Sequence, residues 1–212
     1  MNVLISGQKW FGAEVLRELL KIEGVIVKCV SAPCNQQKED KLWLEAGIKN
    51  IDRIVAGTLN HATMPDNIDL IIAAHSYDFI GEKTRLKARF GGIGYHPSLL
   101  PVHRGRDAVR WAIKMNDKVT GGTVYRLSNK IDGGEILAQQ HVFIRPDDDA
   151  GTLWRRDLAP LGVELLRNVV AEFKERGYIA GEKQDESLAT YEPSFDRPPV
   201  FRPDLIMLGC DA

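Results

Sequence analysis

The sequence predicts an α/β fold in which a mostly parallel central sheet carries helices on both faces. Short apolar runs alternate along the chain with segments of helical periodicity, the pattern of successive strand and helix units. The first run, Val3-Leu4-Ile5, is wholly apolar, as expected for a strand that is buried on both faces. With 212 residues, of which 44% are hydrophobic and 27% charged, the chain is long enough to bury one core.

The first half of the chain supplies the strand and helix units. Strands are expected at residues 3–5, 25–30, 69–74 and 92–95, and helices at residues 12–23, 39–46 and 82–89. Gly24 and Gly47 follow the first two helices, where a glycine commonly ends a helix. Three of the strands end at Ser6, Ala74 and His96. In such sheets ligands bind beyond the carboxyl ends of the strands, so the site is expected there.

The second half of the chain has a different texture. A helix is expected at residues 107–114, β-strands at 120–127 and 135–144 around a turn at 128–134, and a long helix at 152–176. Pro160 is expected to kink that helix or to separate its first turn. Beyond Gly177 we expect a surface strand and then an extended, proline-rich tail.

Composition excludes several classes of function. Lys and Arg total 28 against 29 Asp and Glu, which predicts no nucleic-acid or membrane partner. No apolar run approaches the length of a membrane span, and no secretory signal precedes the first strand. The three cysteines (Cys29, Cys34 and Cys210) form no CxxC pair and indicate no disulfide framework. We therefore expect a cytoplasmic protein, a monomer or a small oligomer such as a homodimer.

His96 is the first candidate for chemistry. It ends a buried strand directly before Pro97, in a segment that Pro101 stiffens further, and histidine is the side chain best suited to proton transfer near neutral pH. A packed, hydrogen-bonded core histidine explains the same pattern. A metal site with His75 and His103 is not expected, because the prolines are rigid and no Cys or acidic motif accompanies the histidines.

Three further segments have two readings each. Asp132 lies in a turn of sequence Ile-Asp-Gly-Gly, which turn formation alone explains, although its carboxylate is also a candidate for chemistry. The basic run at residues 103–106 is either a solvated loop or an anion contact. The glycines at 7 and 12 fit neither the dinucleotide-binding nor the P-loop spacing, so they indicate a strand-to-helix turn, with only weak support for an anion at its amides.

Two motifs together resemble a known family. The run Gly94-Tyr-His-Pro-Ser-Leu-Leu-Pro-Val-His-Arg-Gly105 and the run Ile131-Asp-Gly-Gly-Glu-Ile-Leu137 resemble the catalytic signature of the 10-formyltetrahydrofolate-dependent formyltransferases. With the start Gly7-Gln-x-x-Phe-Gly-x-Glu-Val15, they are most similar to the hydrolase domain of 10-formyltetrahydrofolate dehydrogenase. The resemblance implies a Rossmann-like formyltransferase domain over residues 1–191, followed by a proline-rich C-terminal tail over residues 192–212.

The resemblance also implies the site residues. The family's Asn-x-His and Asp map onto His96 and Asp132 as catalytic residues, but Gly94 stands where the family has its asparagine. Strand alternation puts residues 94 and 96 on one face and Tyr95 on the other, so Tyr95 cannot replace the missing amide. The hydrolase domain of the dehydrogenase also lacks that asparagine, which favours a relative of that branch.

A folate pocket is implied in the same way. Its walls would be the loop after the third predicted strand and the turn that carries the aspartate, namely His75, Ser76, Tyr77, Asp78, Phe79, Ile80, Ser128, Asn129, Lys130 and Ile131. Backbone groups there would read the pterin edge, while Phe79 and Ile80 would cover its faces. Ordinary packing at the entry to a helix also explains Phe79 and Ile80.

Three functions remain open at this point. The first is transfer of a formyl group from 10-formyltetrahydrofolate to the amino group of a small molecule, with no metal. The second is hydrolysis of the same donor, with water as acceptor. The third is a folate-binding module without turnover, against which the presence of both His96 and Asp132 argues. Methionyl-tRNA is a poorer acceptor, because the family's tRNA enzymes add a C-terminal β-barrel.

Overall fold

The computed structural model describes residues 1–34 and 39–196. The proline-rich tail predicted for residues 192–212 lies outside the described residues from residue 197 onward. Residues 192–196 are described, and they pack against a helix of the second half: the Trp111 indole donates to the carbonyl of Pro193 over 2.8 Å, and the rings of Trp111 and Phe195 lie 4.6 Å apart.

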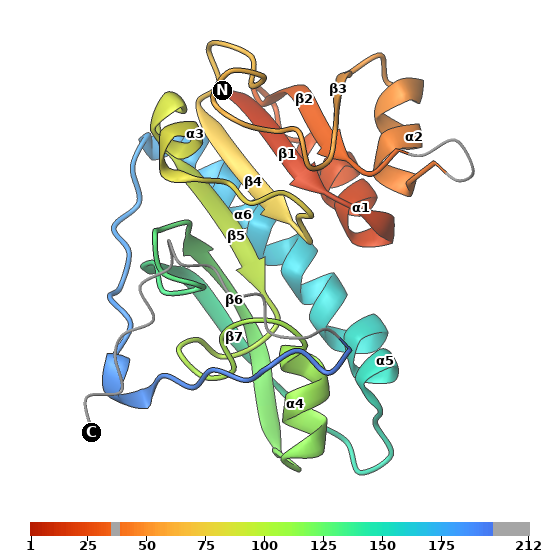
Figure 1. The fold of residues 1–212 in the computed structure, drawn as a ribbon, viewed down its shortest axis with the longest axis vertical. Helices are drawn as coiled ribbons and strands as arrows, with labels where there is room; N and C mark the ends of the chain where they lie inside the picture. Colours follow the sequence, from red (N-terminus) through yellow and green to blue (C-terminus); the bar gives the residue numbers. More distant parts are fainter. Residues whose placement is uncertain (35–38, 197–212) are drawn as a thin grey trace.

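One seven-stranded sheet organises the molecule (Figure 1). Its strands are β1 (Asn2–Gly7), β2 (Ile26–Ala32), β3 (Asp52–Val55), β4 (Leu70–Ala74), β5 (Gly92–His96), β6 (Val119–Arg126) and β7 (Ile136–Phe143), in the spatial order β3-β2-β1-β4-β5-β6-β7. The first five are parallel, and β6 and β7 are antiparallel. The predicted fold class, an α/β protein with a mostly parallel sheet, is therefore confirmed.

Helices cover both faces of this sheet. They are α1 (Lys9–Leu19), α2 (Lys41–Ile48), α3 (Glu82–Lys87), α4 (Ala108–Lys114), α5 (Ala150–Leu153) and α6 (Ala159–Arg176), with a 3₁₀ turn at Glu186–Leu188. On one face, apolar side chains of β1, β4 and β5 bury against α1 and α6 in the main core. On the other face, Leu4 and Ile71 pack with Met64, Ile68 and Ala88 in a smaller core. No helix of the described residues is both long and apolar enough to cross a membrane.

The structure corrects some of the predicted elements and confirms the division expected at Pro160. Strand β3 was not expected, because it is an edge strand of mostly exposed side chains and has no apolar run. The long helix at 152–176 is divided: a π-helical segment, Trp154–Leu158, separates α5 from α6 just before Pro160, as the proline predicts. Among the described residues beyond Gly177, single bridges such as Ile136 to Glu182 replace the expected surface strand.

Tyr95 points away from the face of β5 that carries residues 94 and 96, as strand alternation predicts. Its hydroxyl donates to the carbonyl of Leu158 over 2.6 Å, and its ring lies flat against Gly122 and Gly162. A Cβ at residue 162 would lie 2.5 Å from the nearest ring carbon. Glycine is therefore required there for the close approach of α6 to the sheet.

We predict that Gly162→Ala lowers the free energy of unfolding by about 1–3 kcal/mol, because the added methyl group overlaps the Tyr95 ring. Urea denaturation followed by circular dichroism measures the change. Gly81→Ala is the matched control, since its Cβ would meet only the Phe79 side chain, at 3.7 Å. An unchanged Gly162→Ala midpoint would contradict the assigned packing of α6.

Candidate active site

His96 is the last residue of β5, and its imidazole has an acceptor at each nitrogen. Nε2–H donates to the carbonyl of His103 over 2.7 Å, and Nδ1 faces Oδ2 of Asp132 at 3.5 Å. The side chain is 8% exposed. The structure thus brings together the two residues that the motifs single out.

Asp132 lies in the turn between β6 and β7 with a left-handed backbone, φ 47°. Its Oδ2 accepts the Gly105 N–H over 2.7 Å, and its Oδ1 accepts the Tyr125 hydroxyl over 2.5 Å. The carboxylate is 15% exposed. Hydrogen bonds at both oxygens fix the direction of the carboxylate.

A segment near the C-terminus supports this turn, and no sequence pattern predicted its role. We use "C-terminal strap" for residues 182–196, the blue segment that runs from beyond the end of α6 to α4 in Figure 1. Gln184 in the strap donates from Nε2 to the carbonyls of Asp132 and Gly134, both over 2.7 Å. These contacts join positions about fifty residues apart, which no local periodicity reveals.

Arg104 is completely buried beneath the strap. Its guanidinium donates to the Gln184 side-chain oxygen over 2.6 Å, to the Glu186 carboxylate over 3.0 Å and to the Tyr191 hydroxyl. Its neighbour His103 is also buried, with its ring nitrogens 2.8 Å from Asp117 and 3.0 Å from Glu192. Both readings of the basic run, a solvated loop or an anion contact, are therefore wrong for these two residues, whose partners lie inside the protein.

Arg85 joins the two segments predicted as folate walls. One guanidinium nitrogen donates to the carbonyl of Ile80 over 2.8 Å, and another donates to the side-chain oxygen of Asn129. The loop 75–80 and the turn 128–131 therefore lie side by side. Tyr77, Phe79 and Ile131 are exposed there, at 62%, 58% and 43% respectively, so apolar surface is available to a flat ligand.

Other side chains of the loop 75–80 hold it in place. Asp78 accepts hydrogen bonds from Ser6 over 2.8 Å and Ser31 over 2.6 Å, and its second oxygen accepts the Gly57 N–H over 2.6 Å. Ser76 is bonded to Ser6 over 2.6 Å. These bonds tie together the carboxyl ends of β1, β2 and β4. The Ser76 and Asp78 side chains are thus occupied by structure, and the Asp78 N–H and the carbonyls of Asp78 and Ile80 also have partners within the protein.

His75 begins this loop with a left-handed backbone, φ 62°. Its ring meets Trp154 edge-on at 6.5 Å between centroids. One side of the ring is open to solvent, yet the protein packed around the rest desolvates it and lowers the pKa of His75, an effect to which the charge of Lys9 adds. The neutral imidazole of His75, at the start of the loop, can accept or donate a hydrogen bond.

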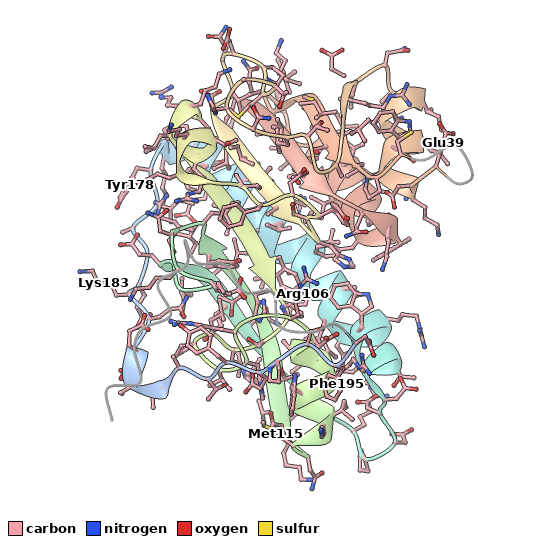
Figure 2. The ribbon with its side chains drawn as sticks, viewed as in Figure 1. Glu39, Arg106, Met115, Tyr178, Lys183 and Phe195 are labelled. Atoms are coloured by element: carbon pink, nitrogen blue, oxygen red, sulfur yellow. The ribbon has the colours of Figure 1, made fainter. Side chains whose placement is uncertain are left out.

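A surface cavity of about 530 Å³ lies on the outer side of the aspartate turn. It is lined by Arg126, Leu127, Ser128, Asn129, Lys130, Gly133, Gly134, Glu135, Lys183, Gln184 and Glu186. Three of the predicted wall residues border it, whereas His96, Asp132 and the loop 75–80 do not. Lys183 is one of these lining residues, and Figure 2 shows its side chain directed away from the ribbon. Within residues 1–34 and 39–196, no group of three His, Cys, Asp or Glu side chains is placed to hold a metal ion.

Fold and site together define a class: an α/β protein with a buried imidazole and carboxylate paired beyond the carboxyl end of a central strand. Comparison with known proteins defines the family. Residues 1–170 match the model of the formyl transferase family. The chain therefore belongs to the formyl transferase family, in agreement with the resemblance of its motifs.

Individual relatives fall in several branches of that family. The chain is 32% identical over 203 residues to a cytosolic 10-formyltetrahydrofolate dehydrogenase of Xenopus laevis, a match that covers 91% of this chain and 22% of the dehydrogenase. It is 30% identical to a methionyl-tRNA formyltransferase of Thermotoga neapolitana, covering 95% of this chain and 67% of that enzyme. The chain thus spans about a fifth of the length of the dehydrogenases it matches.

Solved structures share the fold. An N-formyltransferase of Helicobacter canadensis, in complex with folinic acid and dTDP-3-aminofucose, superposes with a TM-score of 0.72 at 22% identity, covering 90% of this chain and 70% of that one. A phosphoribosylglycinamide formyltransferase of Bacillus halodurans gives a TM-score of 0.69 at 20% identity, covering 84% and 97%. At these identities the likeness establishes the architecture alone.

We predict that Gln184→Ala lowers the free energy of unfolding by about 2 kcal/mol, because two turn carbonyls and the buried Arg104 lose a hydrogen-bond partner. Urea denaturation measures this change. The neighbouring Lys183→Ala, an exposed side chain, is the control and is expected to leave stability within about 0.5 kcal/mol. Equal midpoints for the two variants would remove the strap from the support of the site.

Proposed function

We propose that this chain transfers the formyl group of 10-formyltetrahydrofolate to the amino group of a small molecule. The observation that carries the proposal is the imidazole of His96 facing the carboxylate of Asp132 at 3.5 Å. Membership of the formyl transferase family supports a formyl group as the group transferred. The dehydrogenase relatives, and a structural neighbour bound to folinic acid, support a folate as its carrier.

The reaction needs a stabilised oxyanion and two proton movements. The amine nitrogen attacks the formyl carbon, and the formyl oxygen takes the electron pair of the carbonyl bond. When the carbon–N10 bond breaks, the amine nitrogen has lost a proton and N10 of the folate has gained one. An imidazolium N–H at His96 stabilises the oxyanion and supplies the proton to N10. Asp132 orients the imidazole and accepts the proton of the amine through a water.

The geometry favours Nδ1 of His96 as the donor to the formyl oxygen. Nε2–H is engaged by the carbonyl of His103 at 2.7 Å, whereas Nδ1 lies 3.5 Å from Asp132, too far for a tight hydrogen bond. A substrate oxygen that enters beside Asp132 therefore competes only with the long contact between Nδ1 and Asp132. The short hydrogen bond from Nε2 to the His103 carbonyl stays intact. The His103 carbonyl then holds the ring in a fixed orientation while it donates.

The folate is proposed to lie against the loop 75–80 and the turn 128–131. The exposed side chains of Tyr77, Phe79 and Ile131 offer apolar contact to the flat pterin. Because the side chains of Ser76 and Asp78 and the backbone groups of Asp78 are hydrogen-bonded within the protein, backbone groups of the other wall residues supply the recognition of the pterin edge. Arg85 links the two walls through its hydrogen bonds to Ile80 and Asn129.

Hydrolysis of the same donor is the second candidate. The similarity to 10-formyltetrahydrofolate dehydrogenases favours it, and so does Gly94, where the sequence departs from the transferase motif. Water then takes the place of the amine, and formate leaves in place of the formylated product. The same pair of side chains serves both reactions, so the acceptor alone separates them.

One experiment separates these functions. The chain is incubated with 10-formyltetrahydrofolate alone, and the release of tetrahydrofolate is followed; a panel of amino sugars and amino acid derivatives is then added. Strict dependence on an amine supports transfer. Release without an amine, with formate as product, identifies a hydrolase. Binding of the folate without release under either condition rejects both and identifies a binding module.

We predict that His96→Ala lowers kcat at least 100-fold while the far-UV circular dichroism spectrum is unchanged, because the oxyanion loses its donor. Initial rates of tetrahydrofolate release measure the effect. His141→Ala, an exposed histidine on β7, is the control and is expected to keep the parental rate. Parental activity in His96→Ala would remove His96 from the reaction.

We predict that Asp132→Asn lowers kcat about 100-fold or more, because a neutral amide cannot accept the proton of the amine. The Kd of the folate, measured by calorimetry, is expected to stay within about threefold. The substituted side chain keeps its shape, and other residues form the walls of the proposed folate pocket. Asp66→Asn, an exposed aspartate, is the control. A full-rate Asp132→Asn variant would reduce Asp132 to a turn residue.

A further inference from the structure

The hydroxyl of Tyr125 determines which way the Asp132 carboxylate faces. It donates to Oδ1 over 2.5 Å, while the Gly105 N–H donates to Oδ2 over 2.7 Å, and the same Oδ2 faces His96 Nδ1. A carboxylate held at one oxygen can rotate broadly about its terminal bond. Two donors on opposite oxygens remove that freedom, so the Tyr125 hydroxyl keeps Oδ2 turned toward His96.

Gly94 provides the space in which the Tyr125 ring lies. The two residues are register partners across the antiparallel β5–β6 pair. A Cβ on residue 94 would lie 3.1 Å from Cδ2 of Leu127 and 3.2 Å and 3.3 Å from Cε1 and Cζ of Tyr125, closer than the optimal separation of two carbon atoms. A side chain at position 94 therefore crowds both Leu127 and the Tyr125 ring, and a shift of the ring displaces its hydroxyl from Asp132.

Tyr125 remains a hydrogen-bond donor at neutral pH. Its side chain is buried, and burial together with the negative charge of Asp132 raises the pKa of Tyr125 well above its ordinary value. The phenol consequently keeps its proton beside the carboxylate. Asp132, as the acceptor in this bond, keeps its charge available to His96.

We propose that Tyr125 is a positioning residue of the formyl-transfer site, which holds the Asp132 carboxylate toward His96, and that Gly94 is required to admit its ring. As a statement about the reaction, this rests on the proposed function; as a statement about the geometry, it does not. Tyr125 acts through Asp132, and the loop 75–80 and turn 128–131 form the folate walls. Loss of the Tyr125 hydroxyl is therefore expected to lower kcat and to leave the KM for the folate unchanged.

Tyr125→Phe tests this role, because it removes one oxygen and keeps the ring. We expect kcat to fall about tenfold with the KM for 10-formyltetrahydrofolate unchanged, the effect of losing a hydrogen bond to a charged group. Tyr95→Phe is the matched control: it removes a buried hydroxyl from the other face of β5, where the acceptor is the Leu158 carbonyl. That variant is expected to keep the parental kcat. A parental kcat in Tyr125→Phe would contradict the proposal.

A double variant tests whether Tyr125 acts through Asp132. In an Asp132→Asn background, Tyr125→Phe is expected to lower kcat by less than about twofold, because the carboxylate that it positions is already gone. If the two losses multiply in full, Tyr125 contributes independently of Asp132, and the positioning role is wrong.

The ring ¹⁵N signals of His96, in chain labelled with ¹⁵N-histidine, test the geometry without turnover. Tyr125→Phe and Gly94→Ala are both expected to shift them, and Tyr95→Phe is expected to leave them in place. Unshifted signals in Tyr125→Phe would overturn the proposal. If the parental chain turns over no donor while Tyr125→Phe shifts the signals, the proposed function fails and the positioning of Asp132 by Tyr125 is upheld.

Discussion

Four parts of the chain contact Asp132, three of them at its carboxylate. Gly105 from the loop after β5 and Tyr125 from β6 donate to its oxygens, His96 at the end of β5 faces it, and Gln184 of the C-terminal strap holds the backbone carbonyl of the same residue. A buried charge is tolerated only when it is paired and hydrogen-bonded. The contacts from these segments therefore stabilise the Asp132 carboxylate next to the His96 imidazole.

The sheet provides the fixed frame for that meeting. Because β5 is parallel to β4 and antiparallel to β6, His96 lies at the carboxyl edge of the sheet, and the register of β5 with β6 places Tyr125 opposite Gly94. Tyr95, between Gly94 and His96, points to the other face and is packed under α6. Strand alternation thus places Tyr95, a packing residue, on one face of β5 and the polar site with His96 on the other face.

The parts of the fold that follow local rules were predictable. Uniformly apolar runs identified β1, β4 and β5, and Pro160 marked the division before α6; the exposed edge strand β3 has no such run. The pairing of His96 with Asp132 was expected from the two motifs, not from periodicity. Tyr125 was missed because antiparallel register cannot be read from one strand, and Gln184 because its partners lie far away in the sequence. Both of these contacts depend on tertiary structure, which local patterns do not encode.

The central claim is that a folate formyl group is held against His96 beside Asp132. A crystal structure of the chain with folinic acid, a formyl folate that also occupies the Helicobacter canadensis structural neighbour, tests it most directly. We expect the pterin between residues 75–80 and 128–131, with N10 of the ligand directed toward the His96 imidazole. A folate bound elsewhere, for example in the cavity bounded by Lys130, Lys183 and Glu186 with its N10 remote from His96, would contradict this claim.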